Sequence, residues 1–302
     1  MGVAVLSGVM ASLSSKPEVP KWESHTSGTV TPAVSTEDES QPSRFIACVS
    51  REESARRLKN VFFHLGGLGP SVEICVAQNV HAVQQADVVL LWRVSCLCKP
   101  QLAHTILSEP GLKEALDGKL LISILAGVTI VQLSAMAPSG ARIVRAMPNT
   151  PCKIREGMTV VSNLPQSPTV EIDRKIILNI FSSIGRCRFL EEKHFDACTA
   201  LSGSGPAFAC IFLEAMADGG VMMGLPRAEA LELAAQTLQG AARMTLQAGT
   251  HPAQLKDAVT TPGGCTIAGL LALEDGRVRS TIARAIQIAT ERASELGQPA
   301  KH

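Results

Sequence analysis

Short apolar segments alternate with helical patterns in the first half of the chain, and this alternation constrains the fold more than any other feature. Apolar runs with strand character cover residues 44–50, 72–76, 87–91, 119–125, 142–146 and 158–161. Residues 51–64, 80–86 and 101–116, which lie between them, have the apolar spacing of helices. Strands that alternate with helices predict an α/β protein with a parallel, doubly wound sheet.

The strand signal ends near residue 168. Helical patterns then cover residues 170–184, 194–201, 206–223, 227–247, 252–259, 266–275 and 278–296. Gly224 and Pro226 are typical of one helix that ends and another that begins. We therefore expect a dinucleotide-binding type of domain over residues 1–164 and an all-helical domain over residues 165–302, a division that suits a chain of 302 residues.

The N-terminal stretch differs in character from the rest of the chain. Residues 1–13 have apolar side chains at helical spacing and predict a helix. Residues 14–43 are polar and rich in Pro, Ser and Thr, with little apolar surface to bury, so we expect a flexible insertion.

Composition argues against several classes of partner. The formal net charge is +1, so we expect neither nucleic acid nor an anionic membrane as a partner, and no apolar run has the length of a membrane span. The nine cysteines are an odd number without a C-x-x-C pair. They predict small core residues in a reducing, cytoplasmic compartment, with no disulfide framework and no metal site.

A glycine-rich turn near the C-terminus is the clearest candidate binding feature. Thr260 and Thr261 precede Pro262, Gly263 and Gly264, and an apolar helical pattern comes next. Such a turn points consecutive backbone N–H groups and a helix N-terminus at one place, which suits a small carboxylate. The glycines leave room for a ligand to approach the backbone. The alternative is a turn without any binding role.

Several motifs in one order give the turn its context. They are Ala200–Ala207 (ALSGSGPA), Ala217–Arg227 (ADGGVMMGLPR), Ala234–Leu238 (AAQTL) and Thr261–Gly264 (TPGG). This order resembles the pyrroline-5-carboxylate reductases, and the resemblance extends more loosely upstream through Arg145–Pro151 (RAMPNTP). It implies a Rossmann-like domain followed by a helical dimerisation domain. The implied reaction reduces 1-pyrroline-5-carboxylate to L-proline in a homodimer or higher oligomer.

The resemblance also implies a cofactor site. The expected cofactor is NADPH, with NADH as the alternative, because no Asp or Glu stands at the ribose position. The cofactor-binding positions implied are Gly2, Ser50, Arg51, Asn79, Cys98, Lys99, Pro100, Ile124, Leu125, Ala126 and Asn149.

The substrate site implied by the resemblance is the glycine-rich turn. Thr261, Gly263, Gly264 and Cys265 would hold the ring carboxylate together with Thr266. The Thr266 hydroxyl would lie near the imine nitrogen, where it could donate or relay a proton, so Thr266 is the catalytic candidate.

Two departures from the family leave alternatives open. The G-x-G-x-x-G fingerprint is absent, and Met1–Gly2 resembles only its end, so we expect the first strand of the sheet to be missing. Residues 92–97 resemble an insertion after a strand. The alternatives to an active reductase are an impaired homologue or truncated isoform that acts only as an oligomer subunit, and a related hydroxyacid dehydrogenase, which would require a catalytic Lys that we do not find.

Overall fold

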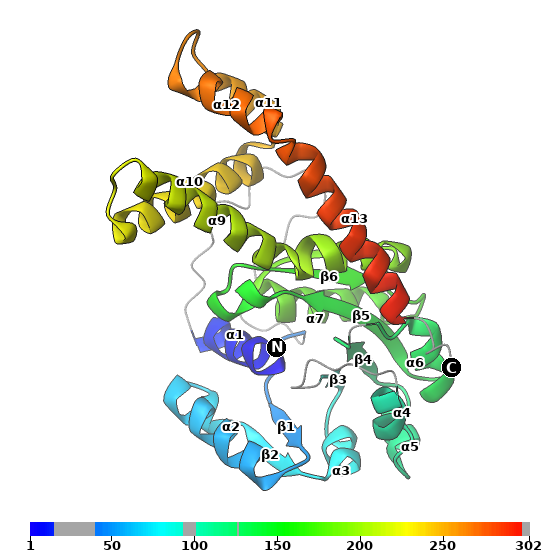
Figure 1. The fold of residues 1–302 in the computed structure, drawn as a ribbon. Helices are drawn as coiled ribbons and strands as arrows, with labels where there is room; N and C mark the ends of the chain where they lie inside the picture. Colours follow the sequence, from blue (N-terminus) through cyan, green and yellow to red (C-terminus); the bar gives the residue numbers. More distant parts are fainter. Residues whose placement is uncertain (15–39, 93–100, 126, 298–302) are drawn as a thin grey trace. The chain divides into compact units, whose positions relative to one another are not determined.

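The computed structural model describes residues 1–14, 40–92, 101–125 and 127–297. They divide into two compact units (Figure 1). The described part of the first unit comprises residues 1–14, 40–203 and 290–297, and the second unit comprises residues 204–289.

Two sheets lie in the first unit. One contains β1 (Ile46–Val49) and β2 (Glu73–Val76), and the other contains, in spatial order, β3 (Val88–Leu91), β4 (Leu120–Ser123), β5 (Arg142–Pro148), β6 (Gly157–Ser162) and β7 (Gly185–Leu190). β1 and β2 are parallel, and so are β3, β4 and β5. Within the described residues, β1 and β3 each have one edge without a strand partner. The architecture is a Rossmann-like sheet interrupted at one position, as expected for a sheet that lacks a central strand.

The helices of the first unit cover both faces of the sheets. They are α1 (Gly2–Ser14), α2 (Glu52–Leu65), α3 (Asn79–Gln84), α4 (Gln101–Leu107), α5 (Leu112–Leu116), α6 (Ile130–Met136), α7 (Val170–Ser182) and α8 (Phe195–Cys198). Short 3-10 turns lie at η1 (Gly69–Ser71), η2 (Thr150–Ile154) and η3 (Glu192–His194), and a π-helical turn lies at η4 (Thr199–Gly203).

Strand β4 is the centre of the core. Leu120 and Ile122 face a cluster with α1, α2 and α7, whereas Leu121 faces a second cluster with α3, α4, α5 and α6. All three side chains are completely buried. Burial on both faces explains why this strand is a continuous apolar run and not an alternating one.

Helix α1 packs against both sheets. Val5, Val9 and Met10 are at most 4% exposed and share one cluster with Ala47 of β1 and Ile122 of β4. The two sheets have no strand pairing with each other, and both contribute residues to this one buried cluster. Burial of apolar area, and not backbone hydrogen bonding, therefore links the two sheets.

Two ion pairs attach other segments to β5. The Arg142 Nε atom lies 2.6 Å from Asp173 of α7, whose side chain is almost fully buried. The Arg145 Nη1 atom lies 2.6 Å from Glu192 Oε1, which also accepts a hydrogen bond from the Ile130 backbone N–H at 2.8 Å. A buried Arg needs such a partner, because an unpaired buried charge is strongly unfavourable.

The sheet departs from the fully parallel arrangement predicted from the sequence. β6 runs antiparallel to β5, and β7 is parallel to β6. The connection from β5 to β6 contains only a few residues and the short turn η2, and a connection this short joins antiparallel strands.

Strand β7 contradicts the prediction that no strand follows residue 168. Cys187 and Phe189 pack against the core, and they alternate in sequence with Arg186 and Arg188. This alternation of polar and apolar residues is typical of a half-buried strand, and sequence reasoning overlooked it. The expected domain junction at 164/165 falls between β6 and α7, whereas the division into compact units follows Gly203.

Two helix predictions also need correction. The helix expected over residues 101–116 is split into α4 and α5, because Pro110 and Gly111, with φ of 84° at Gly111, interrupt it. Helix α6 was missed, although Thr129 and Gln132 form a capping box that the sequence pattern T-x-x-Q predicts.

The expected insertion at residues 14–43 is ordered at both ends. Ser14 ends α1, and Ser40 is buried, with its hydroxyl 2.8 Å from Asn179 Nδ2 of α7. Residues 15–39 lie outside the described residues.

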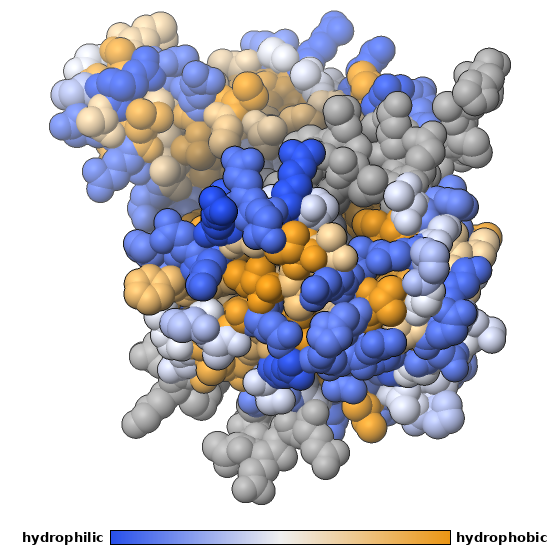
Figure 2. All heavy atoms as spheres, turned by 90° about the horizontal axis from the view of Figure 1, so that it is seen from below, coloured by the Kyte–Doolittle hydropathy of each residue, from blue (hydrophilic) through white to orange (hydrophobic). Residues whose placement is uncertain are grey.

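Seen from below, the surface of the molecule is largely hydrophilic, with separate hydrophobic patches (Figure 2).

The second unit consists of helices. They are α9 (Gly205–Met222), α10 (Arg227–Ala248), α11 (Pro252–Ala258), α12 (Cys265–Asp275) and α13 (Val278–Gly297), whose last turns belong to the first unit. Helices α9 and α10 pack through small residues: Ala217, Ala230 and Ala234 are buried, and a Cβ on Gly220 would lie 3.2 Å from the Ala230 Cβ. The turn expected at Gly224–Pro226 is confirmed.

Most large apolar residues of the second unit are exposed. Ile211, Met222, Met223, Leu233 and Leu271 all have more than half of their surface accessible. The continuous helical stretch Glu192–Met222 is long and apolar enough to cross a membrane by length and composition, although no such run was expected from the sequence. Exposed apolar surface of this kind is typical of interaction sites.

We predict that Met10→Ala strongly destabilises the protein. Met10 is 1% exposed beneath both sheets, so its truncation leaves a cavity that costs about 2–5 kcal/mol. Urea denaturation followed by circular dichroism measures the change. Ser12→Ala, at an exposed position of the same helix, is the control. Equal losses in the free energy of unfolding of the two variants would show that Met10 of α1 does not contribute to the core.

Candidate functional site

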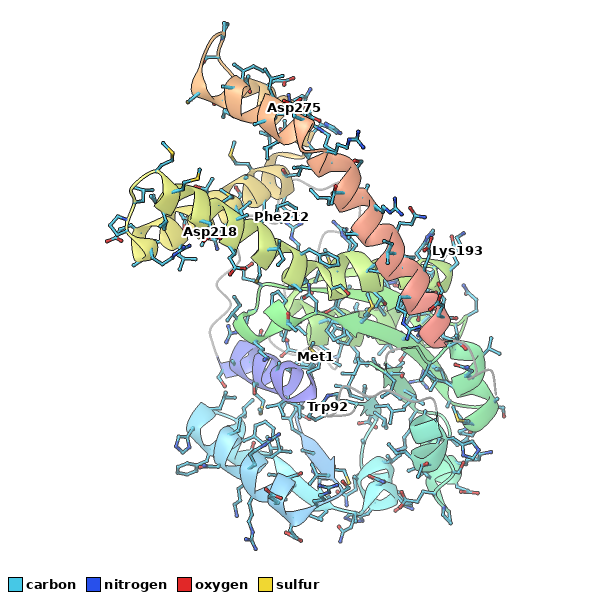
Figure 3. All side chains as sticks on the ribbon, in the orientation of Figure 1. Met1, Trp92, Lys193, Phe212, Asp218 and Asp275 are labelled. Carbon is cyan, nitrogen blue, oxygen red and sulfur yellow. The ribbon has the colours of Figure 1, made fainter. Side chains whose placement is uncertain are left out.

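The carboxyl ends of the parallel strands form the first candidate site. In doubly wound sheets, ligands bind at this edge, next to helix N-termini. The end of β3 lies beside the end of β4, where the Ile124 backbone N–H donates to Leu91 O at 3.0 Å. Met1 and Trp92 lie next to each other at the start of α1 (Figure 3). Trp92, Ile124 and the first turn of α1 therefore mark one part of this edge.

Gly2 begins α1 in close contact with an aromatic ring. A Cβ added to Gly2 would lie 2.2 Å from Cδ2 and Cε3 of Trp92 and 2.8 Å from its Cγ. Gly2 is buried, and Trp92 is half-buried. The absence of a side chain at Gly2 is what allows the indole to lie against the backbone of α1.

Lys153 supplies positive charge near the same turn. Burial, and then the Lys153 ammonium, lower the pKa of the Met1 amine. The N-terminal end of α1 carries a partial positive charge from its backbone N–H groups and contains no acidic residue in its first turn. This corner of the protein therefore suits an anion electrostatically.

The end of β1 contains the next group of expected cofactor residues. Ser50 and Arg51 are exposed, and Arg51 is the N-cap of α2 without a capping hydrogen bond from its side chain. The Arg51 guanidinium forms no ion pair with any described residue. It can therefore reach a phosphate at this position, although Glu52 and Glu53 come directly after it.

Asn79 lies near Ser50 but is engaged within the protein. Its Nδ2 donates to Glu109 Oε2 at 2.8 Å, and its Oδ1 accepts from Cys48 Sγ at 3.1 Å. Burial raises the pKa of the Cys48 thiol, so the thiol remains protonated and able to donate. Among the described residues, nothing else bonds to the Asn79 side chain, which leaves one N–H and one lone pair for a ligand.

The structure describes only two of the remaining positions at the end of β4 and in the segment before α4. Ile124 and Leu125 come directly after β4, where Leu125 is buried and its backbone N–H donates to Ser123 Oγ at 3.4 Å. Cys98, Lys99, Pro100 and Ala126 lie outside the described residues.

Asn149 has a structural function in the first unit. Its Nδ2 donates to Ser202 O at 3.1 Å, and its Oδ1 accepts from the Met158 backbone N–H at 2.8 Å. These bonds join the end of β5 to β6 and to η4. The Ser202 turn that resembles the family motif is therefore held by Asn149.

The glycine-rich turn forms the second candidate site, in the second unit. Gly263 has φ of 67°, which favours glycine, and the Gly264 N–H donates to Thr261 O at 3.1 Å. Gly264 is the N-cap of α12, and no side chain caps this helix. The first N–H groups of α12 therefore have no side-chain acceptor, and the absence of acidic residues in the first turn leaves the helix dipole available to a carboxylate.

The five expected substrate residues gather at this turn. Thr261, Gly263 and Cys265 are exposed, and Gly264 and Thr266 are half-buried. The Thr261 Oγ1 atom would lie only 2.4 Å from a Cβ on Gly264, so the threonine hydroxyl lies directly beside the helix start. Thr266 forms no hydrogen bond through its hydroxyl with any described residue, and the hydroxyl is available to a ligand.

Sequence reasoning missed three residues of the first site. Trp92 was interpreted only as part of an insertion, and neither Glu109 nor Lys153 stands in a motif. Their positions depend on which loops meet at the sheet edge, and no local pattern encodes this. Within the described part of the chain, no group of three His, Cys, Asp or Glu side chains could hold a metal ion.

We predict that Gly2→Ala moves the indole. The new methyl group would overlap the Trp92 ring, so the variant should lose about 1–3 kcal/mol of stability and expose the indole to water. Trp92 is the single tryptophan in a Trp22→Phe background, so its emission reports the change. A shift to longer wavelength is expected, with Ser12→Ala as control. Unchanged emission would show that the ring does not contact α1.

Comparison with known proteins shows the family to which the chain belongs. Residues 192–296 match the family model described as pyrroline-5-carboxylate reductase dimerisation. The chain is 47% identical to a pyrroline-5-carboxylate reductase of Schizosaccharomyces pombe over 85% of this chain and 87% of the relative. It is 46% identical to one of Lophium arboricola over 99% of this chain and 91% of the relative. A crystal structure of the Plasmodium falciparum pyrroline carboxylate reductase with NADP bound matches with a TM-score of 0.71 at 28% identity, over 99% of this chain and 95% of that one. The chain belongs to the pyrroline-5-carboxylate reductase family.

Proposed function

We propose that this protein is an oxidoreductase that reduces 1-pyrroline-5-carboxylate to L-proline with NADPH. The observation that carries the proposal is the uncapped N-terminus of α12, with Gly263 and Gly264 in its turn, in a chain whose relatives of this name match it over most of its length. An uncapped helix N-terminus without acidic residues suits the carboxylate of this substrate.

The residues of the turn bind and orient the substrate. The backbone N–H groups of Cys265 and Thr266 hold the ring carboxylate, and the lack of a Cβ at Gly264 lets Thr261 close the turn around them. The Thr266 hydroxyl lies near the imine nitrogen and donates or relays a proton there. A strong general acid is unnecessary, because an imine is basic and can bind already protonated. Orientation of this kind supplies much of the rate enhancement in a bimolecular reaction.

The sheet edge binds the nicotinamide cofactor. Arg51 and Ser50 lie where a ribose 2′-phosphate can be held, and the start of α1 at Gly2, against which the Trp92 indole lies, presents a helix N-terminus to the pyrophosphate. Absence of a carboxylate at Ser50 and Arg51 favours NADPH over NADH. When bound, the cofactor supplies a hydride from its reduced nicotinamide C4 to the imine carbon and is itself oxidised. The P. falciparum structure with NADP bound supports this choice.

The principal alternative is a homologue that acts only as an oligomer subunit. The interrupted sheet and the indole against Gly2 are the observations in its favour. The two possibilities differ in turnover, because a subunit without its own activity oxidises no NADPH when 1-pyrroline-5-carboxylate is added.

We predict that the purified chain oxidises NADPH when 1-pyrroline-5-carboxylate is added, and that Gly264→Ala impairs this reaction. The added Cβ would lie 2.4 Å from Thr261 Oγ1 and 3.2 Å from Thr261 O, so the turn must open. A fall in kcat/KM on the order of tenfold is expected, because a small displacement of the substrate disturbs its alignment.

Gly269→Ala is the matched control for this experiment. Gly269 lies within the same helix, and a Cβ there meets no atom within 4 Å. Its activity should equal that of the parent. An inactive parent that is folded by circular dichroism would favour the non-catalytic alternative, and equal activity in Gly264→Ala would remove the turn from the substrate site.

We further propose that the second unit forms a homodimer or a higher homo-oligomer, and that the protein acts in the cytoplasm. The exposed apolar residues of α9, α10 and α12 and the match to a dimerisation family support the oligomer. Seven cysteines without disulfides in the described chain support a reducing compartment.

We predict that Ile211→Glu dissociates the oligomer. Ile211 is 65% exposed on α9, and a buried, unpaired carboxylate there would cost several kcal/mol of association free energy, on the order of 3–5 kcal/mol. Light scattering after size exclusion measures the mass. Val131→Glu on α6, which is 76% exposed in the first unit, is the control with the same chemistry. An unchanged mass in Ile211→Glu would place the interface elsewhere.

A further inference from the structure

Trp92 is placed where the proposed cofactor would approach the backbone. It comes after β3 at the carboxyl edge of the sheet, and its ring carbons Cγ, Cδ2 and Cε3 lie against Gly2 at the first turn of α1 (Figure 3). Glycine at a helix start normally allows a phosphate group to reach the backbone N–H groups. Here the space that the glycine leaves is filled by an indole.

The indole makes an apolar contact with α1, and its N–H group is left without a hydrogen bond to any described residue. The Trp92 Nε1 atom is buried and has no hydrogen-bond partner among the described residues. It lies on the side of the five-membered ring opposite the carbons nearest Gly2. A buried donor without an acceptor costs free energy. The start of α1 cannot satisfy it, because a helix N-terminus presents donors and not acceptors. The docked indole is therefore less stable than its burial alone would suggest.

The position of the Trp92 ring against Gly2 and the free-energy cost of its unpaired N–H group together indicate that the ring moves. A phosphate and an indole cannot both occupy the space against Gly2, and the indole carbons offer nothing that binds an anion. Lys153 and the partial charge of α1 favour an anion at the same place.

We propose that the Trp92 indole is a gate that covers the start of α1 and leaves it when the cofactor pyrophosphate binds. This inference rests on the proposed function for the identity of the ligand. Trp92 then determines cofactor affinity without being a catalytic residue, since the apparent affinity is reduced by the fraction of molecules in which the gate is closed.

The experiment compares three forms of the full chain: Trp22→Phe, in which Trp92 is the sole tryptophan, and the same background with Trp92→Phe or Trp92→Ala. NADPH is titrated while its nicotinamide emission is recorded under direct excitation. Trp92→Ala should bind NADPH on the order of tenfold more tightly than Trp22→Phe. Trp92→Phe retains an apolar ring against Gly2, so its gain in NADPH affinity should be smaller. This variant replaces Trp92→Ala in the comparison if Trp92→Ala does not fold.

A second measurement monitors the gate itself. NADP⁺ and inorganic pyrophosphate are added separately to the Trp22→Phe form, and the indole emission should shift to longer wavelength with either ligand as the ring enters water. Acrylamide quenching should rise in parallel. An emission shift with pyrophosphate shows that the start of α1 alone is sufficient to open the gate.

The outcomes separate this proposal from the proposed function. Equal or weaker NADPH binding by Trp92→Ala, with normal binding by Trp22→Phe, overturns the gate and leaves the reductase assignment intact. If no form binds NADPH, the proposed cofactor is wrong, and the gate is then tested with pyrophosphate alone. The gate is rejected if pyrophosphate causes no emission shift and Trp92→Ala binds pyrophosphate no more tightly than Trp22→Phe.

Discussion

The apolar face of α1 is the contact on which the first unit depends. A doubly wound sheet is usually held together by an uninterrupted hydrogen-bond ladder, and here the ladder stops between β1 and β3. Val5, Val9 and Met10 pack against residues of both sheets and replace directional hydrogen bonds with buried area. Hydrophobic burial does not depend on exact register, so it can bridge two sheets that do not pair. The position of α1 also decides where its N-terminus, and with it Gly2, is presented.

The two candidate sites rely on the backbone more than on ionisable side chains. Both use a helix N-terminus, at α1 and α12, and in both a glycine stands where a Cβ would collide with a neighbouring side chain, Trp92 at Gly2 and Thr261 at Gly264. Hydride transfer to an imine needs alignment and stabilisation of a carboxylate, and fixed N–H groups provide both without a titrating residue. The difference between the sites is access. The turn before α12 is exposed, whereas the start of α1 is covered by Trp92.

The second unit leaves many of its large apolar side chains exposed. Helices α9 and α10 pack closely because Ala217, Gly220 and Ala230 are small, and small residues bury little area. The larger side chains, among them Ile211, Met222 and Leu233, point outward. The high apolar content of the sequence is consistent with this arrangement, and the same composition explains why the stretch Glu192–Met222 resembles a membrane span.

Sequence alone determined the elements whose signals are local. The alternation of strands and helices predicted the Rossmann-like unit, helical spacing placed α9 to α13 almost to the residue, and the turn at Gly263 and Gly264 was found from its composition. Sequence reasoning overlooked three local features: the alternation of polar and apolar residues in β7, the break between α4 and α5, and the short connection that makes β6 antiparallel to β5. Only the tertiary structure decided that Asn79 and Asn149 hydrogen-bond within the protein and that Trp92 covers Gly2. Each of these depends on residues far apart in the chain meeting at one place, and such contacts leave no periodic signal in the sequence.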